Sequence, residues 1–187
     1  MCKVLIMYAT REGQTGKIAR RIAASLADAG VSVRLLDARE REVADALDLA
    51  AFDLLVFGGS MHAGGLESEL VRFVNGRAQQ IERMPRSFFL VLLSAATPDP
   101  ALRTAWLADA DRKMKHQLAA TFDDCEIIAG ALRYSQYSLP LKWLMRRIAR
   151  QAGGDTDTSR DYEYTDWRQV EHYARRLASL VQIAGSG

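Results

Sequence analysis

Five apolar segments, separated by segments with helical spacing, constrain the fold of this chain more than any other feature. They lie at residues 3–9, 31–37, 52–59, 87–94 and 125–132. Four of the five are nearly continuous in apolar residues rather than alternating. Continuous apolar strands are typical of parallel sheets that are covered on both faces. Because strands and helices alternate along the chain, we predict an α/β fold with a doubly wound, five-stranded parallel sheet.

Apolar residues at helical spacing indicate the helices that should cover this sheet. Three stripes are formed by Ile18, Ile22 and Leu26; by Leu66, Leu70, Phe73 and Val74; and by Leu102, Trp106, Met114 and Leu118. A last helix, with Thr165 as its expected cap, presents Trp167, Val170, Ala174, Leu177 and Val181. We expect these apolar residues to form the core.

The length of 187 residues is suited to one domain, and the net charge of +2 does not indicate nucleic-acid binding. No apolar run approaches the roughly 20 residues that cross a bilayer, and the N-terminus does not read as a signal peptide. We therefore expect a cytoplasmic protein. Cys2 and Cys125 fit neither a disulfide framework nor a metal site, so we expect reduced core thiols and no bound metal.

The turn after the first strand, "TREGQTGK", predicts a phosphate site. Thr10, Gly13 and Thr15 frame a turn that leads directly into a helix, whose N-terminus offers backbone N–H groups and a positive dipole end to an anion. The alternative is that Gly13 only permits the turn and Thr15 only caps the helix.

Other phosphate-binding motifs do not fit this turn. The earlier glycine of a Walker A motif is missing, and no G-x-G-x-x-G follows a strand. A receiver domain would need acidic residues after the first strand and an aspartate at the end of the third, where this chain has Thr10 and Gly58.

The turn resembles the flavodoxin signature, in which "TREGQT" would supply Thr10, Arg11, Glu12, Gly13, Gln14 and Thr15 to the phosphate of FMN. Glu12 stands where flavodoxins commonly carry a hydroxyl, and we expect it to point outward. The resemblance implies that FMN lies at the carboxyl ends of the central strands. Two further loops would contact it, through Gly59, Ser60, Met61, His62, Ala63 and Gly64 and through Ser94, Ala95, Ala96 and Thr97.

These two loops contain one ring, that of His62, where flavodoxins usually stack an aromatic residue on the flavin. One face of the flavin would therefore be open, which suits an enzyme with a bulky substrate. His62 is the candidate for a catalytic contact with flavin or substrate, and the alternative is an ordinary surface histidine. No other catalytic acid or base stands out.

Residues 133–161 form an unusually long insertion before the last helix. Its segment "LPLKWLMRRIARQAGG" predicts an amphipathic helix with an apolar stripe. Residues suited to a membrane surface or to an anionic substrate accompany the stripe: Lys142, Trp143, Arg146, Arg147 and Arg150. The alternative is that the stripe packs on the domain.

A narrower resemblance rests on "TREGQT", "MPRSFFLV", "IAGALRY", "GGDTDT" and "YTDW" in this order. The chain is similar to the flavodoxin-like protoporphyrinogen oxidases, the menaquinone-dependent protoporphyrinogen IX dehydrogenases. This implies an FMN enzyme of haem biosynthesis that oxidises protoporphyrinogen IX and passes electrons to a quinone at the inner face of the cytoplasmic membrane. The second loop, "MHAGGLE", departs from the family because it lacks the expected tyrosine and arginine.

Three alternatives remain at this point. A flavodoxin without a substrate of its own would normally be acidic. An NAD(P)H-dependent quinone reductase of the same fold would accept electrons from a nicotinamide, and a flavin-free interaction module would be colourless. The sequence leaves the oligomeric state open.

Overall fold

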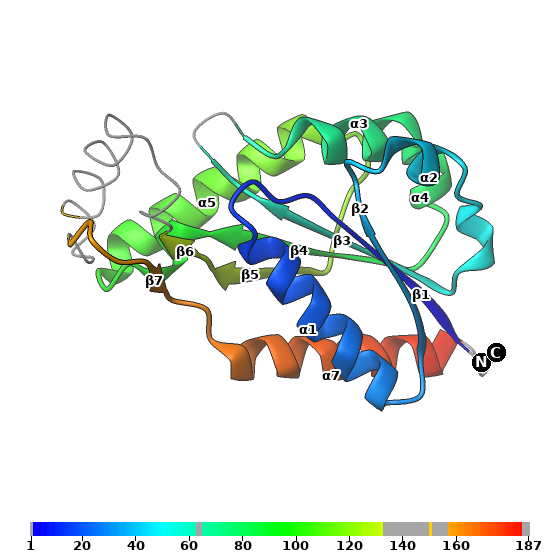
Figure 1. Cartoon of the computed structure of the whole chain (residues 1–187). Coiled ribbons are helices and arrows are strands. Elements are labelled where there is room, and N and C mark those ends of the chain that lie inside the picture. Colours follow the sequence, from blue (N-terminus) through cyan, green and yellow to red (C-terminus); the bar gives the residue numbers. More distant parts are fainter. Residues whose placement is uncertain (1, 63–64, 133–149, 151–156, 185–187) are drawn as a thin grey trace.

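The computed structural model describes residues 2–62, 65–132, 150 and 157–184. Its centre is a five-stranded parallel sheet in the order β2-β1-β3-β4-β5 (Figure 1). The strands are β1 Lys3–Tyr8, β2 Ser32–Asp37, β3 Leu54–Ser60, β4 Arg86–Leu92 and β5 Cys125–Ala129. This is the strand order of flavodoxin-like doubly wound sheets, so the predicted fold class is confirmed.

Helices cover both faces of the sheet (Figure 1). One face carries α1 Gln14–Asp28 and α7 Trp167–Ala184, and the other carries α3 Ser68–Gly76 and α5 Pro100–Gln117. The shorter helices are α2 Arg41–Asp45, η1 Leu49–Ala51, α4 Ala78–Ile81 and η2 Leu93–Ala96.

The core has one apolar layer on each face of the sheet, built largely from the predicted stripes. Strands β1, β3 and β4 are buried almost throughout, whereas β2 and β5, at the two edges, are partly exposed. Fully or nearly fully buried residues from the helices are Ile18, Ile22, Leu26, Leu70, Phe73, Val74, Met114, Val170, Ala174, Leu177 and Val181. Trp167 is partly buried against the same layer as α1.

The observed strands differ from the predicted segments by a few residues, and two differences affect the loops. β3 continues through Ser60, so Ser60 belongs to the strand as Gly59 does. The last predicted strand divides at Gly130, whose N–H donates to the Leu92 carbonyl while its own carbonyl accepts from Tyr164. Beyond Gly130, β6 Ala131–Leu132 leaves the main sheet and pairs antiparallel with β7 Tyr162–Glu163.

Three predictions about the helices are wrong. Thr165 does not cap α7, because Asp166 Oδ1 accepts from the N–H groups of Arg168 (2.9 Å) and Gln169 (3.4 Å). Leu66 is buried but precedes α3. Leu102 is 40% exposed, since it lies in the first half of α5 and only the second half of this helix contributes buried residues.

The helix predicted near Pro140 lies outside the described residues, together with Lys142, Trp143, Arg146 and Arg147. Arg150 is described, and it is helical and exposed. Within the described part of the chain, no helix has the length and apolar character needed to cross a membrane. Cys2 and Cys125 are free thiols, as predicted, although both are half-buried rather than fully in the core.

Candidate active site

Three loops follow the carboxyl ends of the central strands β1, β3 and β4. After β1 the chain adds β2 on one side, and it then returns to add β3 on the other, so the strand order reverses at β1 and β3. Ligands of doubly wound sheets bind at such a reversal. The hydrogen bonding between neighbouring strands extends one residue into the first two loops. The Ala9 N–H donates to the Gly58 carbonyl (2.9 Å), and the Met61 N–H donates to the Val91 carbonyl (3.0 Å).

The first loop, residues 10–15, is fixed by local backbone geometry. Gly13 has a φ of +87°, in the left-handed region that favours glycine, and its N–H donates to Thr10 Oγ1 at 2.9 Å. The Thr10 hydroxyl therefore keeps its own hydrogen for a ligand. Helix α1 begins at Gln14, and no side chain caps its N-terminus. Thr15, fully buried in the first turn, is not the cap.

A chain of two hydrogen bonds links this loop to the carboxyl end of the edge strand β5. Gln14 Nε2 donates to Thr165 Oγ1 at 2.9 Å, and Thr165 Oγ1 donates to the Ala129 carbonyl at 2.7 Å. Gln14 and Thr165 are both buried. The start of α1 is thus joined to the ends of β5 and the start of α7. Glu12 is half-buried.

Two backbone hydrogen bonds close the second loop just after β3. His62 and Gly65 exchange two backbone hydrogen bonds, of 3.1 Å and 3.0 Å, and Gly65 has a φ of +104°. The Leu66 N–H donates to Gln117 Oε1 at 2.9 Å, which holds the loop to the end of α5. Ala63 and Gly64 lie outside the described residues.

Packing leaves little room for a side chain at the two glycines of β3. A Cβ on Gly58 would lie 1.9 Å from Cζ of Phe89, and one on Gly59 would lie 3.0 Å from the side chains of Leu66 and Leu70. At Gly58 the neighbouring Phe89 ring therefore explains the glycine without a ligand.

Glu67 is a site residue that sequence reasoning missed. Its carboxylate, only 7% exposed, accepts from Ser60 Oγ (3.0 Å), lies 3.2 Å from His62 Nε2, and accepts from Arg11 Nη2 (3.4 Å). Burial alone would raise the pKa of this carboxyl, but His62, and then Ser60 and Arg11, lower it below its ordinary value. Glu67 thus joins the first loop to the second as a buried carboxylate.

The third loop is a single turn of 3₁₀ helix. In η2, Ser94, Ala95 and Ala96 are half-buried, and the buried Thr97 closes the turn by donating its N–H to the Ser94 carbonyl at 3.2 Å. Asp99 then caps α5 through the N–H groups of Ala101 and Leu102. The predicted loop residues therefore form an ordered turn beside the end of β4.

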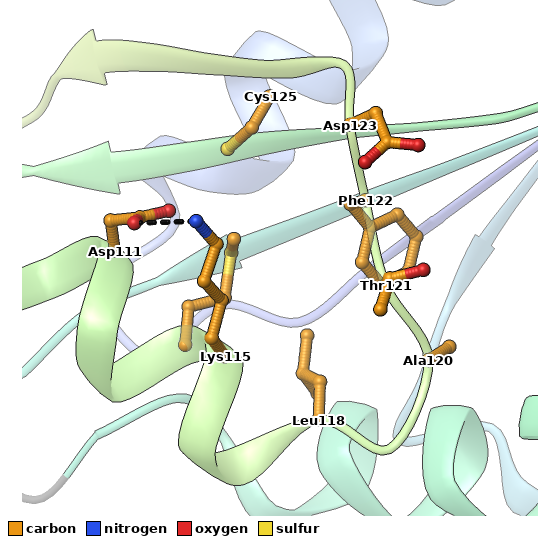
Figure 2. Close-up of a pocket in the computed structure, with 9 residues that line it drawn as sticks. Asp111, Lys115, Leu118, Ala120, Thr121, Phe122, Asp123 and Cys125 are labelled. Atoms are coloured by element: carbon orange, nitrogen blue, oxygen red, sulfur yellow. Dashed lines mark hydrogen bonds and ion pairs between the residues drawn. The ribbon is translucent and has the colours of Figure 1, made fainter.

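A cavity of about 480 Å³ lies elsewhere, between the second half of α5 and the start of β5 (Figure 2). Figure 2 shows the Asp111–Lys115 ion pair of 2.8 Å at its wall and Cys125 across from it. Burial, with the nearby carboxylates, raises the pKa of the Cys125 thiol to about 12, so this cysteine stays protonated and unreactive. No residue of the three loops lines this cavity.

Comparison with known proteins identifies the family. A family model described as a flavodoxin domain matches residues 5–159. A protein of Escherichia coli (strain K12) named protoporphyrinogen IX dehydrogenase (quinone) is 34% identical over 179 residues, which are 96% of each chain. The chain belongs to the flavodoxin-like protoporphyrinogen IX dehydrogenase family. The predicted family and its FMN cofactor are thereby confirmed.

Further similarities agree with this membership. A protein of Leishmania major with the same name is 30% identical, over 95% of this chain and 75% of the relative. Two solved flavodoxins share the fold: one from Streptococcus pneumoniae TIGR4 (16% identity, TM-score 0.53, 95% of this chain and 99% of the flavodoxin) and Flavodoxin 1 of Bacillus cereus (14%, 0.51, 96% and 97%).

Proposed function

We propose that this protein oxidises protoporphyrinogen IX to protoporphyrin IX with FMN and passes the electrons to a quinone. The observation that carries the proposal is 34% identity, extending over 96% of both chains, to a relative named protoporphyrinogen IX dehydrogenase (quinone).

The first loop is proposed to hold the phosphate of FMN. The N-terminus of α1 has no side-chain cap, and the dipole of this 15-residue helix favours an anion there. The Thr10 hydroxyl adds a donor, since its oxygen already accepts from the Gly13 N–H. Arg11, Glu12 and Gln14 complete the loop.

The second and third loops are proposed to border the isoalloxazine ring, through residues 59–64 and 94–97. The bound flavin supplies the redox chemistry, and the chain contributes binding, orientation and electrostatics. Neither loop contains a phenylalanine, tyrosine or tryptophan. Without such a ring over the flavin, a flat macrocycle has room to lie against it.

Turnover under anaerobic conditions tests the reaction. FMN-loaded protein should convert protoporphyrinogen IX into fluorescent protoporphyrin only when a quinone is supplied, and NADH or NADPH should leave its flavin oxidised. A flavin that is reduced promptly by a nicotinamide, but not by the porphyrinogen, would contradict the proposal and favour an NAD(P)H-dependent quinone reductase.

We further propose that the insertion binds the inner face of the cytoplasmic membrane, where a lipid-soluble quinone is available. Each basic residue near an anionic surface contributes about 1 kcal/mol. Replacing Lys142, Arg146, Arg147 and Arg150 by glutamine should therefore release the protein from anionic vesicles in a co-sedimentation assay. The matched control replaces four exposed arginines of α1 and α7: Arg20, Arg21, Arg168 and Arg175. Equal binding by the two quadruple variants would contradict a membrane role for the insertion.

A further inference from the structure

A histidine and a buried carboxylate meet where β3 opens into the second loop. His62 Nε2 lies 3.2 Å from Glu67 Oε1 and 3.2 Å from Ser60 Oγ. Glu67 is 7% exposed, whereas the His62 side chain is 27% exposed. The pair thus combines a carboxylate shielded from water with an imidazole that a ligand can reach.

The hydrogen bonds around Nε2 determine which ring nitrogen carries the hydrogen. Ser60 donates its single hydroxyl hydrogen to Glu67 Oε1 at 3.0 Å, so the Ser60 oxygen can only accept from His62. The carboxylate is an acceptor as well. Because both neighbours of Nε2 are acceptors, Nε2 is the protonated nitrogen, and in the neutral ring Nδ1 is the basic one.

The surroundings of Glu67 keep it ionised for this task. Burial acts against the charged form, yet contacts with His62, Ser60 and Arg11 lower the pKa of the carboxyl below its ordinary value. Arg11 is 67% exposed, so its charge is largely screened by water. A buried carboxylate that orients an imidazole and stabilises its protonated form is an arrangement found at sites of proton transfer.

The proposed reaction requires a proton acceptor. Conversion of the porphyrinogen into the porphyrin removes four hydrogens from the bridge carbons and two from pyrrole nitrogens. Over the three two-electron oxidations, three of these hydrogens would leave bridge carbons with an electron pair, as hydrides that an oxidised flavin can accept. The other three leave as protons: two come from N–H bonds, whose electron pairs stay on the macrocycle, and one comes from the fourth bridge carbon.

We propose that His62 Nδ1 accepts the proton released from a pyrrole N–H of the substrate, and that Glu67 is the positioning residue that holds the ring for this step. The inference rests on the proposed function. His62 then returns the proton to water, to which its side chain is partly open. Glu67 remains a carboxylate throughout and balances the transient imidazolium.

Variants of the FMN-loaded full chain test the proton transfer. His62→Ala should lower kcat by about 10²-fold or more, the range of general base catalysis, and added imidazole should restore part of the loss. His116→Ala, at an exposed histidine of α5, is the matched control. Glu67→Gln should lower kcat by about tenfold with little change in KM, and Glu67→Asp should recover part of the lost kcat. The control for Glu67→Gln is Glu42→Gln, at an exposed position of α2.

A measurement without turnover tests the geometry. The ¹⁵N chemical shifts of the His62 ring should show a hydrogen on Nε2 in the parent protein and a mixture of the two neutral forms in Glu67→Gln. A ring protonated on Nδ1 would overturn the proposal even if His62→Ala failed to fold. An active parent with an equally active His62→Ala would overturn the proton-accepting role alone, whereas a parent that never oxidised the porphyrinogen would overturn the proposed function and this role with it.

Discussion

The first and second loops lie side by side at the carboxyl end of the sheet, yet they are fixed in different ways. The first loop depends on neighbours in the sequence, because the left-handed Gly13 bonds to Thr10 three positions earlier. The second depends on distant partners: Arg11 reaches Glu67 across 56 positions, and Gln117 holds Leu66 across 51. We therefore expect the first loop to keep its geometry when remote packing changes. The second loop should lose its geometry under the same change.

The largest effect on FMN affinity is expected at Gly13, because the backbone geometry of the first loop depends on this residue. Gly13→Val forces a β-branched residue to a φ of +87°, although the space around its Cβ is open. We expect FMN affinity to fall by more than about 100-fold, measured by flavin fluorescence titration, because the N–H groups of the loop no longer converge on the phosphate.

Gly30→Val is the matched control for this change. Gly30 follows the other end of α1, with a φ of +78° and open space around its Cβ. It should cost a similar amount of folding stability while leaving FMN affinity close to that of the parent. Equal loss of FMN in the two variants would show that the loss follows from strain at the ends of α1 rather than from the phosphate loop.

The strand that leads into the second loop should be sensitive to packing. In Gly58→Ala the new Cβ would lie 1.9 Å from the Phe89 ring, so the ring or the strands must shift. Overpacking of this kind costs about 1–3 kcal/mol, which chemical denaturation would measure. Gly76→Ala, where the Cβ meets no atom within 4 Å, is the control and should be close to neutral. A Gly58→Ala variant as stable as the parent would disprove the packing requirement.

A smaller effect is expected where the first loop does depend on a distant residue. Thr165→Val removes the acceptor of the buried Gln14 amide and the donor to the Ala129 carbonyl. Unfolding free energy should fall by about 1–2 kcal/mol, and FMN affinity by less than in Gly13→Val. Thr104→Val, at an exposed threonine of α5, is the control. If Thr165→Val lost FMN as completely as Gly13→Val, the first loop would not be locally determined.

The smallest effect concerns the charge of Glu67. Its pKa is lowered in the folded protein, so the ionised carboxyl contributes stability above the ordinary glutamate value of about 4.3, and this contribution is lost as the pH falls through the lower folded pKa. The stability difference between the parent and Glu67→Gln should therefore shrink between about pH 5 and about pH 3 in urea denaturation. A difference that stayed constant over this range would contradict an ionised Glu67.

The fold and the first loop could be predicted because their signals are local. Continuous apolar strands and helical stripes determine the sheet and its layers, and a glycine before a helix determines the phosphate turn. Glu67 could not be found in this way, since a lone glutamate near a helix start reads as an exposed first-turn acid. The partners of Glu67 become visible only from the strand order, which brings Arg11 beside β3. The sequence predicts Thr165 rather than Asp166 as the cap of α7. Neither composition nor spacing shows that the Thr165 hydroxyl instead forms hydrogen bonds with Gln14 and Ala129.

A single-turnover mixing experiment tests the central claim most directly, because it needs neither membrane nor quinone. FMN-loaded protein is mixed anaerobically with protoporphyrinogen IX in a stopped-flow instrument, and flavin absorbance is followed. We expect the flavin to be bleached as the macrocycle loses its first two electrons, and we expect Glu67→Gln to slow this step while Glu42→Gln does not. A flavin that stayed oxidised in the presence of the porphyrinogen would contradict the proposed reaction.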